Sequence, residues 1–291
     1  MAYTVAGGFA ALVSDLDLTP RQKEIADGRV DHLVTYFINN IACARYPFVI
    51  GSYDRSTVIR WRRDIDVMVS LAYDPYWARH GDDSAAMLRW LRDRLDAEYG
   101  DTIVSTKQVA IRMALGDGLQ VDLVPTFERK NEGFLVPNGK GRWLSTNPPF
   151  HSALMTTNNI RLNLKLKPLV RLMKAWNEAN GRHLRSFHLE MMVDEMCQGE
   201  AALGDHPRAM TDALRKGVTW LKYPMNDPWL DGGLVPLDAY LSDDERTRVI
   251  RMFEADRKRA DEALAYAAAG RIADAYGRWN TVFNGRFPAY G

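Results

Sequence analysis

The segment GSYDRSTVIRWRRDIDVMVSL places two carboxylates, Asp64 and Asp66, one residue apart within an apolar run. In a β-strand, residues i and i+2 point to the same face, so both carboxylates lie side by side while Ile65 points away. Neighbouring carboxylates repel each other unless a positive charge compensates them. A divalent cation supplies such a charge, and Mg²⁺ prefers carboxylate and phosphate oxygens. The D-I-D spacing therefore predicts a metal site.

A third carboxylate, Asp122, lies in the apolar stretch GLQVDLVPTF. Strand alternation sends Val121 and Leu123 to the face opposite Asp122. Three aspartates on two neighbouring strands can hold two metal ions about 3.5–4 Å apart, the arrangement used for in-line displacement at phosphorus. The alternative is that the aspartates cap strands at an exposed edge. Their apolar neighbours disfavour it, because a buried unpaired charge is costly.

A candidate phosphate-binding turn precedes the aspartates. Gly51 and Ser52 end the short strand predicted over PFVIGS, residues 47–52. Glycine lets the backbone approach a phosphate, and Ser52 adds a hydroxyl and an N–H donor. A short helix is expected to begin at Arg55–Thr57, with an N-terminus that favours anions.

The elements that must position these residues form two groups. Residues 1–150 are predicted to form a mixed α/β catalytic core with one long helix over Leu18–Pro47, for which Thr19 is the candidate N-cap. Strands are expected near residues 64–72 and 102–128, with a Gly-Asp-Gly turn at 116–118. Residues 151–291 carry helical periodicity and are predicted to form a helical lobe. The fold class is α/β (α+β), with two lobes and the active site in the cleft between them.

The composition excludes several classes of function. The 291 residues carry a net charge of +1, so bulk charge does not favour nucleic acid or anionic membranes. Cys43 and Cys197 are widely separated and predict buried, reduced thiols rather than a zinc site. We find no signal peptide and no apolar run long enough to span a bilayer, so the expected location is the cytoplasm, with no membrane partner.

With these motifs in place, the chain resembles the polymerase-β-like nucleotidyltransferases. Within them it is similar to the bacterial cyclic-oligonucleotide synthases (CD-NTases) related to cyclic GMP–AMP synthase and oligoadenylate synthetase. The resemblance covers most of the chain and is carried by GSYDRSTVI, DIDVMV, VDLVPTF and LKPLVRLMKAWNEANGRHLRSFHLEMMV. It implies that the Gly51–Ser52 turn holds the triphosphate and that Asp64, Asp66 and Asp122 bind two Mg²⁺ ions, which Mn²⁺ can replace. Asp122 would also accept the proton of the attacking hydroxyl.

The resemblance also assigns nucleotide-binding residues to the second lobe. Lys174 matches a lysine that reaches the triphosphate, although Lys167, Arg171 and Lys174 also read as one solvated helix face. Ser186 and Phe187 match a serine that contacts phosphate and an aromatic that stacks on the donor base. Ser186 reads equally as a helix N-cap, and Phe187 as a core aromatic.

Three finer features are implied by the same resemblance. Asn159, or its neighbour Asn158, is a candidate for an acceptor-pocket asparagine that favours pyrimidine bases such as uracil. The terminal Gly291 is a candidate for conjugation by a ubiquitin-ligase-like partner. The zinc insertion of the superfamily's metazoan DNA sensor has no counterpart here, so double-stranded nucleic acid is not expected as an obligatory activator.

The predicted activity is synthesis of a cyclic di- or trinucleotide from ribonucleoside triphosphates, with release of pyrophosphate. The resemblance implies a second messenger in bacterial antiviral (CBASS) defence, read by a separate effector. One alternative is a related transferase that acts on an RNA end, a protein or a small molecule. The other is a non-catalytic nucleotide-binding protein, which the intact aspartate triad disfavours.

Overall fold

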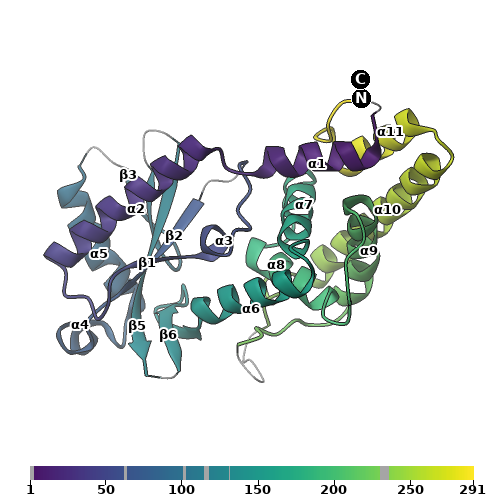
Figure 1. The fold of residues 1–291 in the computed structure, drawn as a ribbon. Helices are drawn as coiled ribbons and strands as arrows, with labels where there is room; N and C mark the ends of the chain where they lie inside the picture. The colour runs from purple at the N-terminus through teal and green to yellow at the C-terminus, as the bar shows by residue number, and fades with distance from the viewer. Residues whose placement is uncertain (1–2, 62–63, 101–102, 115–117, 131, 230–235) are drawn as a thin grey trace. The chain divides into compact units, whose positions relative to one another are not determined.

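The chain packs as two compact units in a computed structural model (Figure 1). The model describes residues 3–61, 64–100, 103–114, 118–130, 132–229 and 236–291. The sheet unit comprises residues 18–58 and 62–152, and the helical unit comprises residues 1–17, 59–61 and 153–291. Residues 1–17 thus pack with the helices, whereas the sequence assigned them to the first domain.

The sheet unit is built on a mixed sheet whose central pair of strands is parallel. Its strands run in the order β1-β2-β5-β4-β3, and β6 pairs with both β5 and β7. Only the β2–β5 pair is parallel among the described pairings. The strands are β1 (Phe48–Ile50), β2 (Asp64–Ser70), β3 (Ile103–Thr106), β4 (Ile111–Ala114), β5 (Gln120–Arg129), β6 (Gly133–Pro137) and β7 (Trp143–Thr146).

Helices cover one face of this sheet because the strands alternate. Apolar residues of β2, β4 and β5 at odd-numbered positions, such as Ile65 and Val121, pack against α2 and α5 (Figure 1). The helices of the unit are α2 (Pro20–Asn40), α3 (Gly51–Asp54), α4 (Tyr73–His80) and α5 (Ser84–Glu98). The even-numbered residues of the same strands, including the three aspartates, therefore belong to the opposite face.

The predicted leading helix is confirmed at its start and shorter at its end. Thr19 and Gln22 form a reciprocal capping box, and Pro20 is the first helical residue. The helix ends at Asn40 rather than near Pro47, and Cys43 beyond it forms a β-bridge with Leu71. The short helix expected at Arg55–Thr57 is also corrected: α3 begins at Gly51. Residues 116 and 117 of the predicted Gly-Asp-Gly turn lie outside the described residues.

The second half of the chain is helical, as predicted. Its helices are α6 (Pro148–Arg161), α7 (Leu166–Ala179), α8 (Ser186–Met196), α9 (His206–Trp220), α10 (Asp243–Ala268) and α11 (Ile272–Val282). They are joined in the helical unit by α1 (Val5–Leu16), which the sequence analysis missed. Phe9 of α1 packs edge-on against Trp279 of α11 at 4.7 Å between ring centroids, and both side chains are fully buried.

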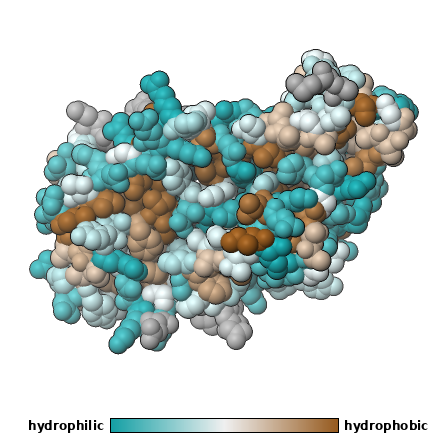
Figure 2. Space-filling model, in the orientation of Figure 1, coloured by the Kyte–Doolittle hydropathy of each residue, from teal (hydrophilic) through white to brown (hydrophobic). Residues whose placement is uncertain are grey.

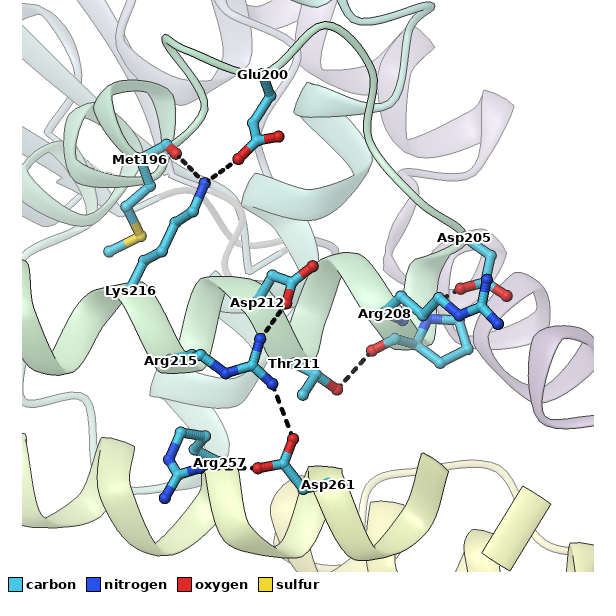
Figure 3. Close-up of polar contacts among 11 residues, drawn as sticks. Met196, Glu200, Asp205, Arg208, Thr211, Asp212, Arg215, Lys216, Arg257 and Asp261 are labelled. Atoms are coloured by element: carbon cyan, nitrogen blue, oxygen red, sulfur yellow. Dashed lines mark hydrogen bonds and ion pairs between the residues drawn. The ribbon is translucent and has the colours of Figure 1, made fainter. Parts of the chain in front are cut away.

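Charged side chains of α9 form hydrogen bonds and ion pairs with neighbouring helices of the helical unit (Figure 3). The Lys216 ammonium donates to the backbone carbonyl of Met196 at 2.7 Å, and so stabilises the C-terminal end of α8. Arg215 lies between Asp212 of its own helix and Asp261 of α10. These pairs are exposed, so each contributes little to stability.

The surface of the face in view is largely polar, with separate hydrophobic patches (Figure 2). Among the described residues, none of the helices combines the length and the apolar character that crossing a bilayer requires. Both cysteines are free thiols, as the sequence predicted, and Cys197 is buried while Cys43 is half-buried.

Candidate active site

The three predicted aspartates come together on β2 and β5. In the parallel register, Asp66 lies directly opposite Asp122, and Asp64 lies opposite Gln120. Asp64 and Asp66 share a face of β2 while Ile65 is buried on the other, as the D-I-D spacing predicts. The Asp122 side chain is 13% exposed and that of Asp64 is 30% exposed. The site is therefore half-buried and lined by acids.

Gly51 lies against this cluster. Ile50 pairs with Asp66 across β1 and β2, so the chain leaves β1 beside the Asp66 carboxylate. Gly51 has a φ of +73°, and a Cβ at this position would overlap the Oδ2 atom of Asp66. Only glycine satisfies both the backbone conformation and this close approach. Ser52 follows in α3, where its carbonyl accepts hydrogen bonds from the N–H groups of Thr57 (2.9 Å) and Val58 (3.0 Å).

Gly51→Ala should therefore distort the Asp66 carboxylate. We expect a stability loss of about 1–2 kcal/mol from the left-handed backbone and a fall in turnover of about a hundredfold from the displaced carboxylate. Gly28→Ala is the matched control, because nothing lies within 4 Å of its added methyl group. Urea unfolding and initial-rate assays on the two variants measure both effects. Equal activity of the two variants would contradict the proximity of Gly51 to the working carboxylate.

Arg112, which no sequence motif pointed to, places a positive charge among these acids. Arg112 lies on β4 directly opposite Asp122. Its Nε donates to Oδ1 of Asp122 at 2.7 Å, and its Nη2 donates to Oδ2 at 2.5 Å. These hydrogen bonds raise the pKa of Arg112 above its usual value, so it stays charged.

The donor set fits a divalent cation in its chemistry, because Asp64, Asp66 and Asp122 offer the carboxylate oxygens that Mg²⁺ prefers. Their side chains do not yet converge as a ligand set: among the described residues, no group of three or more acidic, histidine or cysteine side chains is arranged to hold a metal ion. The structure thus holds a carboxylate cluster whose charge Arg112 compensates in part, through Asp122 and Asp64.

The remaining predicted site residues belong to the helical unit. Lys174 is buried, with only 7% exposure, and its ammonium lies 2.9 Å from Glu190 Oε1 of α8, whose side chain is 0% exposed. The alternative of a solvated cationic face on α7 is wrong, since Arg171 is also largely buried and pairs with Asp17. The triphosphate role of Lys174 stays a prediction.

Ser186 and Phe187 open α8. Ser186 is its first residue and Arg185 occupies the N-cap position without a side-chain cap, so the N-cap reading of Ser186 is corrected. Glu190 does not form a capping box there, because its carboxylate pairs with Lys174. Phe187 is half-buried and packs against the helical core. Contact of this pair with a nucleotide stays a prediction.

Asn158 and Asn159 are both buried on α6, with 7% exposure each. Asn158 Nδ2 donates to both carboxylate oxygens of Asp194, at 2.9 Å each. Asn159 Oδ1 accepts the backbone N–H of Lys167 at 3.0 Å and so holds the first turn of α7. A base-reading role for Asn159 stays a prediction.

Asp194 gives the helical unit a pH dependence. Burial raises the pKa of Asp194 to about 6, although the Asn158 hydrogen bond opposes this rise. Because the folded pKa lies above the unfolded value of 3.8, its stability contribution is full below about pH 4 and is lost as pH rises toward 6. Relative to Asp194→Asn, the wild type should lose about 2–3 kcal/mol between pH 4 and 7 in urea unfolding. A constant difference between the two proteins across this range would contradict the raised pKa.

The mixed sheet, with three aspartates on one face of its parallel pair, agrees with the fold class that the resemblance predicted. Residues 3–159 match the family model of the Second Messenger Oligonucleotide or Dinucleotide Synthetase (SMODS) domain, and the chain belongs to that family. The chain is 30% identical over 161 residues to a cyclic AMP-AMP-AMP synthase from an Acinetobacter strain. That alignment covers 51% of this chain and 45% of the relative, so the chain spans about half the length of this relative.

Solved structures share the fold along nearly the whole chain. The Escherichia coli MS115-1 CdnC:HORMA-deltaN complex superposes with a TM-score of 0.77 at 18% identity, covering 97% of this chain and 98% of that chain. The Vibrio cholerae cyclic AMP-GMP synthase DncV superposes with a TM-score of 0.65 at 17% identity, covering 97% and 85%. At these identities the likeness establishes the fold alone.

Proposed function

We propose that this protein is a metal-dependent nucleotidyltransferase that joins ribonucleoside triphosphates into a cyclic di- or trinucleotide and releases pyrophosphate. The observation that carries the proposal is the β2–β5 register, which sets Asp66 opposite Asp122 with Gly51 against the Asp66 carboxylate. Membership of the SMODS family and similarity to a cyclic AMP-AMP-AMP synthase support the same reaction class. The three acids would hold two Mg²⁺ ions, with Mn²⁺ as a substitute.

The three aspartates and the Gly51–Ser52 segment would have different roles in this reaction. Asp64 and Asp66 would bind and orient the metal-bound triphosphate, and Asp122 would also accept the proton of the attacking 2′- or 3′-hydroxyl. Gly51 and Ser52, the first residues of α3, would bring backbone N–H donors toward the phosphates. When bound, the divalent cations supply charge neutralisation for the triphosphate and the departing pyrophosphate.

The proposed roles in the helical unit are less direct. Lys174 and Glu190 form a buried ion pair. Lys174 would therefore contact the triphosphate while it is also paired with the Glu190 carboxylate. Ser186 and Phe187 would contact the phosphate and the base of the donor nucleotide, and Asn159 would favour a pyrimidine such as uracil. Partners proposed for the whole protein are a separate effector that reads the product and a conjugation partner at Gly291. The protein would act in the cytoplasm, without double-stranded nucleic acid as an obligatory activator.

Product analysis tests the function and separates it from the alternatives. Pure protein is incubated with all four ribonucleoside triphosphates and Mg²⁺ or Mn²⁺, treated with phosphatase, and analysed by mass spectrometry. A phosphatase-resistant cyclic product is expected, and its mass identifies the bases. Turnover that requires an added RNA, protein or small-molecule acceptor would favour the related transferase. Nucleotide binding without metal-dependent turnover would favour the non-catalytic protein.

A further inference from the structure

Arg112 holds both oxygens of the proposed catalytic carboxylate. Its guanidinium forms a two-pronged pair with Asp122, at 2.7 Å to Oδ1 and 2.5 Å to Oδ2. The third nitrogen, Nη1, donates to Gln120 Oε1 at 2.5 Å, and Nη2 also lies 3.6 Å from Asp64 Oδ2. One cation therefore bridges β4, β5 and β2 at the centre of the acidic cluster.

The strand register fixes this arrangement. Arg112 lies opposite Asp122 on antiparallel β4, and Gln120 lies two residues before Asp122 on the same face of β5. The Arg112 side chain is 23% exposed and that of Asp122 is 13% exposed, so bulk water screens the pair only in part. A planar guanidinium fork matches a carboxylate in this two-pronged manner, whereas an ammonium cannot.

Because of this contact, Arg112 and a metal ion would bind the same carboxylate group, that of Asp122. A divalent cation that binds Asp122 needs at least one oxygen to which Arg112 now donates. It also meets a like charge within a few ångströms in a partly screened site. Either the guanidinium releases one carboxylate oxygen, or the metal binds more weakly. Arg112 and a divalent cation therefore compete for the Asp122 carboxylate.

We propose that Arg112 is a positioning residue that holds the Asp122 carboxylate and competes with the divalent cation for it, and so sets the metal concentration at which the site fills. The inference rests on the proposed function, because it takes the three aspartates as the metal ligands. It assigns to Arg112 no contact with nucleotide. Without the competing arginine, the acidic cluster would take up metal before nucleotide arrives.

The direction of the change in Mn²⁺ affinity distinguishes this role from one in which Arg112 only stabilises the packing of the strands. Mn²⁺ is titrated into the full chain without nucleotide, and free Mn²⁺ is followed by its electron paramagnetic resonance signal. If Arg112 competes, Arg112→Gln binds Mn²⁺ about tenfold more tightly than wild type, because a nearby positive charge is gone. If Arg112 only braces the strands, the loosened Asp122 carboxylate binds Mn²⁺ more weakly.

Three further variants complete the design. Arg112→Lys keeps the charge but not the fork, and its Kd for Mn²⁺ should stay within about threefold of wild type. Arg129→Gln is the matched control: it removes an arginine from β5 that pairs with Glu132, and its Kd should not change. Asp66→Asn reports whether Mn²⁺ occupies the aspartates at all, and it should abolish the tight site.

A measurement on the wild type covers the case in which Arg112→Gln does not fold. The Nε–H resonance of Arg112 in arginine-labelled protein should shift on saturation with Mg²⁺, since Nε donates to Asp122 Oδ1. An unchanged or raised Kd in folded Arg112→Gln, or an unmoved Nε–H resonance at saturating Mg²⁺, would overturn the role of Arg112 alone. Mn²⁺ binding that does not depend on Asp66 would overturn the proposed metal site and this inference with it.

Discussion

Asp66→Asn should abolish nucleotidyl transfer while leaving the protein folded. Loss of a metal-binding carboxylate removes several kcal/mol of transition-state stabilisation, so kcat should fall at least about a thousandfold. The fold should survive because Asp66 is only half-buried and lies on the sheet face away from α2 and α5, whereas its neighbours Ile65 and Val67 form the core. Rates are measured as pyrophosphate release, and folding as the urea midpoint.

Glu128→Gln provides the control for that variant. Glu128 lies on β5, the strand that carries Asp122, and pairs with Arg45 at 3.4 Å on the surface, where both side chains are more than 40% exposed. Such a pair contributes little to stability, so this variant should behave as wild type. Turnover near the wild-type rate in pure Asp66→Asn would remove the basis for assigning the reaction to this site.

Lys174→Met should cause the largest loss of stability. It leaves the Glu190 carboxylate, which is 0% exposed, without the ammonium that lies 2.9 Å away. Removing one partner of a buried ion pair costs about 3–5 kcal/mol, because the remaining charge loses its counter-charge in a buried site. Urea unfolding measures this loss, and Lys174→Met combined with Glu190→Leu should recover most of it. A loss below about 1 kcal/mol in the single variant would show that the pair is not a buried ion pair in solution.

The double variant also tests the triphosphate role of Lys174. If it folds and its KM for nucleotide rises, Lys174 contacts the triphosphate as well as Glu190. If its KM and kcat match those of wild type, the lysine serves the helical core alone, and the role implied by the resemblance is wrong. The stability readout and the kinetic readout are independent, so one variant separates the two interpretations.

Alternation within strands made the acidic face predictable from sequence. The D-I-D spacing and the apolar neighbours of Asp122 were sufficient to place three carboxylates on one face of adjacent strands, because side-chain direction depends only on position in the strand. The start of α2 was equally predictable, since a capping box is a local signal. Local chemistry thus accounts for the framework of the site.

The partners of these residues were harder to predict, because they come from other elements. Arg112 was overlooked, although the sequence held a signal for it. Arg112 and Asp122 are equally far from Asp117 along the chain, so a tight hairpin would place these two residues opposite each other, as the register of β4 and β5 does. Burial of Lys174 against Glu190 depends on how α7 packs on α8 and has no local signal. Helix α1 was missed because Gly7 and Gly8 weaken helix propensity, although Thr4 caps it.

Anomalous diffraction from crystals grown with Mn²⁺ and a non-hydrolysable ribonucleoside triphosphate would test the central claim most directly. We predict manganese peaks contacted by carboxylate oxygens of Asp66 and Asp122, with the triphosphate beside Gly51–Ser52 and the Arg112 guanidinium moved off one oxygen of Asp122. Bound nucleotide with no manganese at the aspartates, and with Arg112 still holding both oxygens of Asp122, would contradict it.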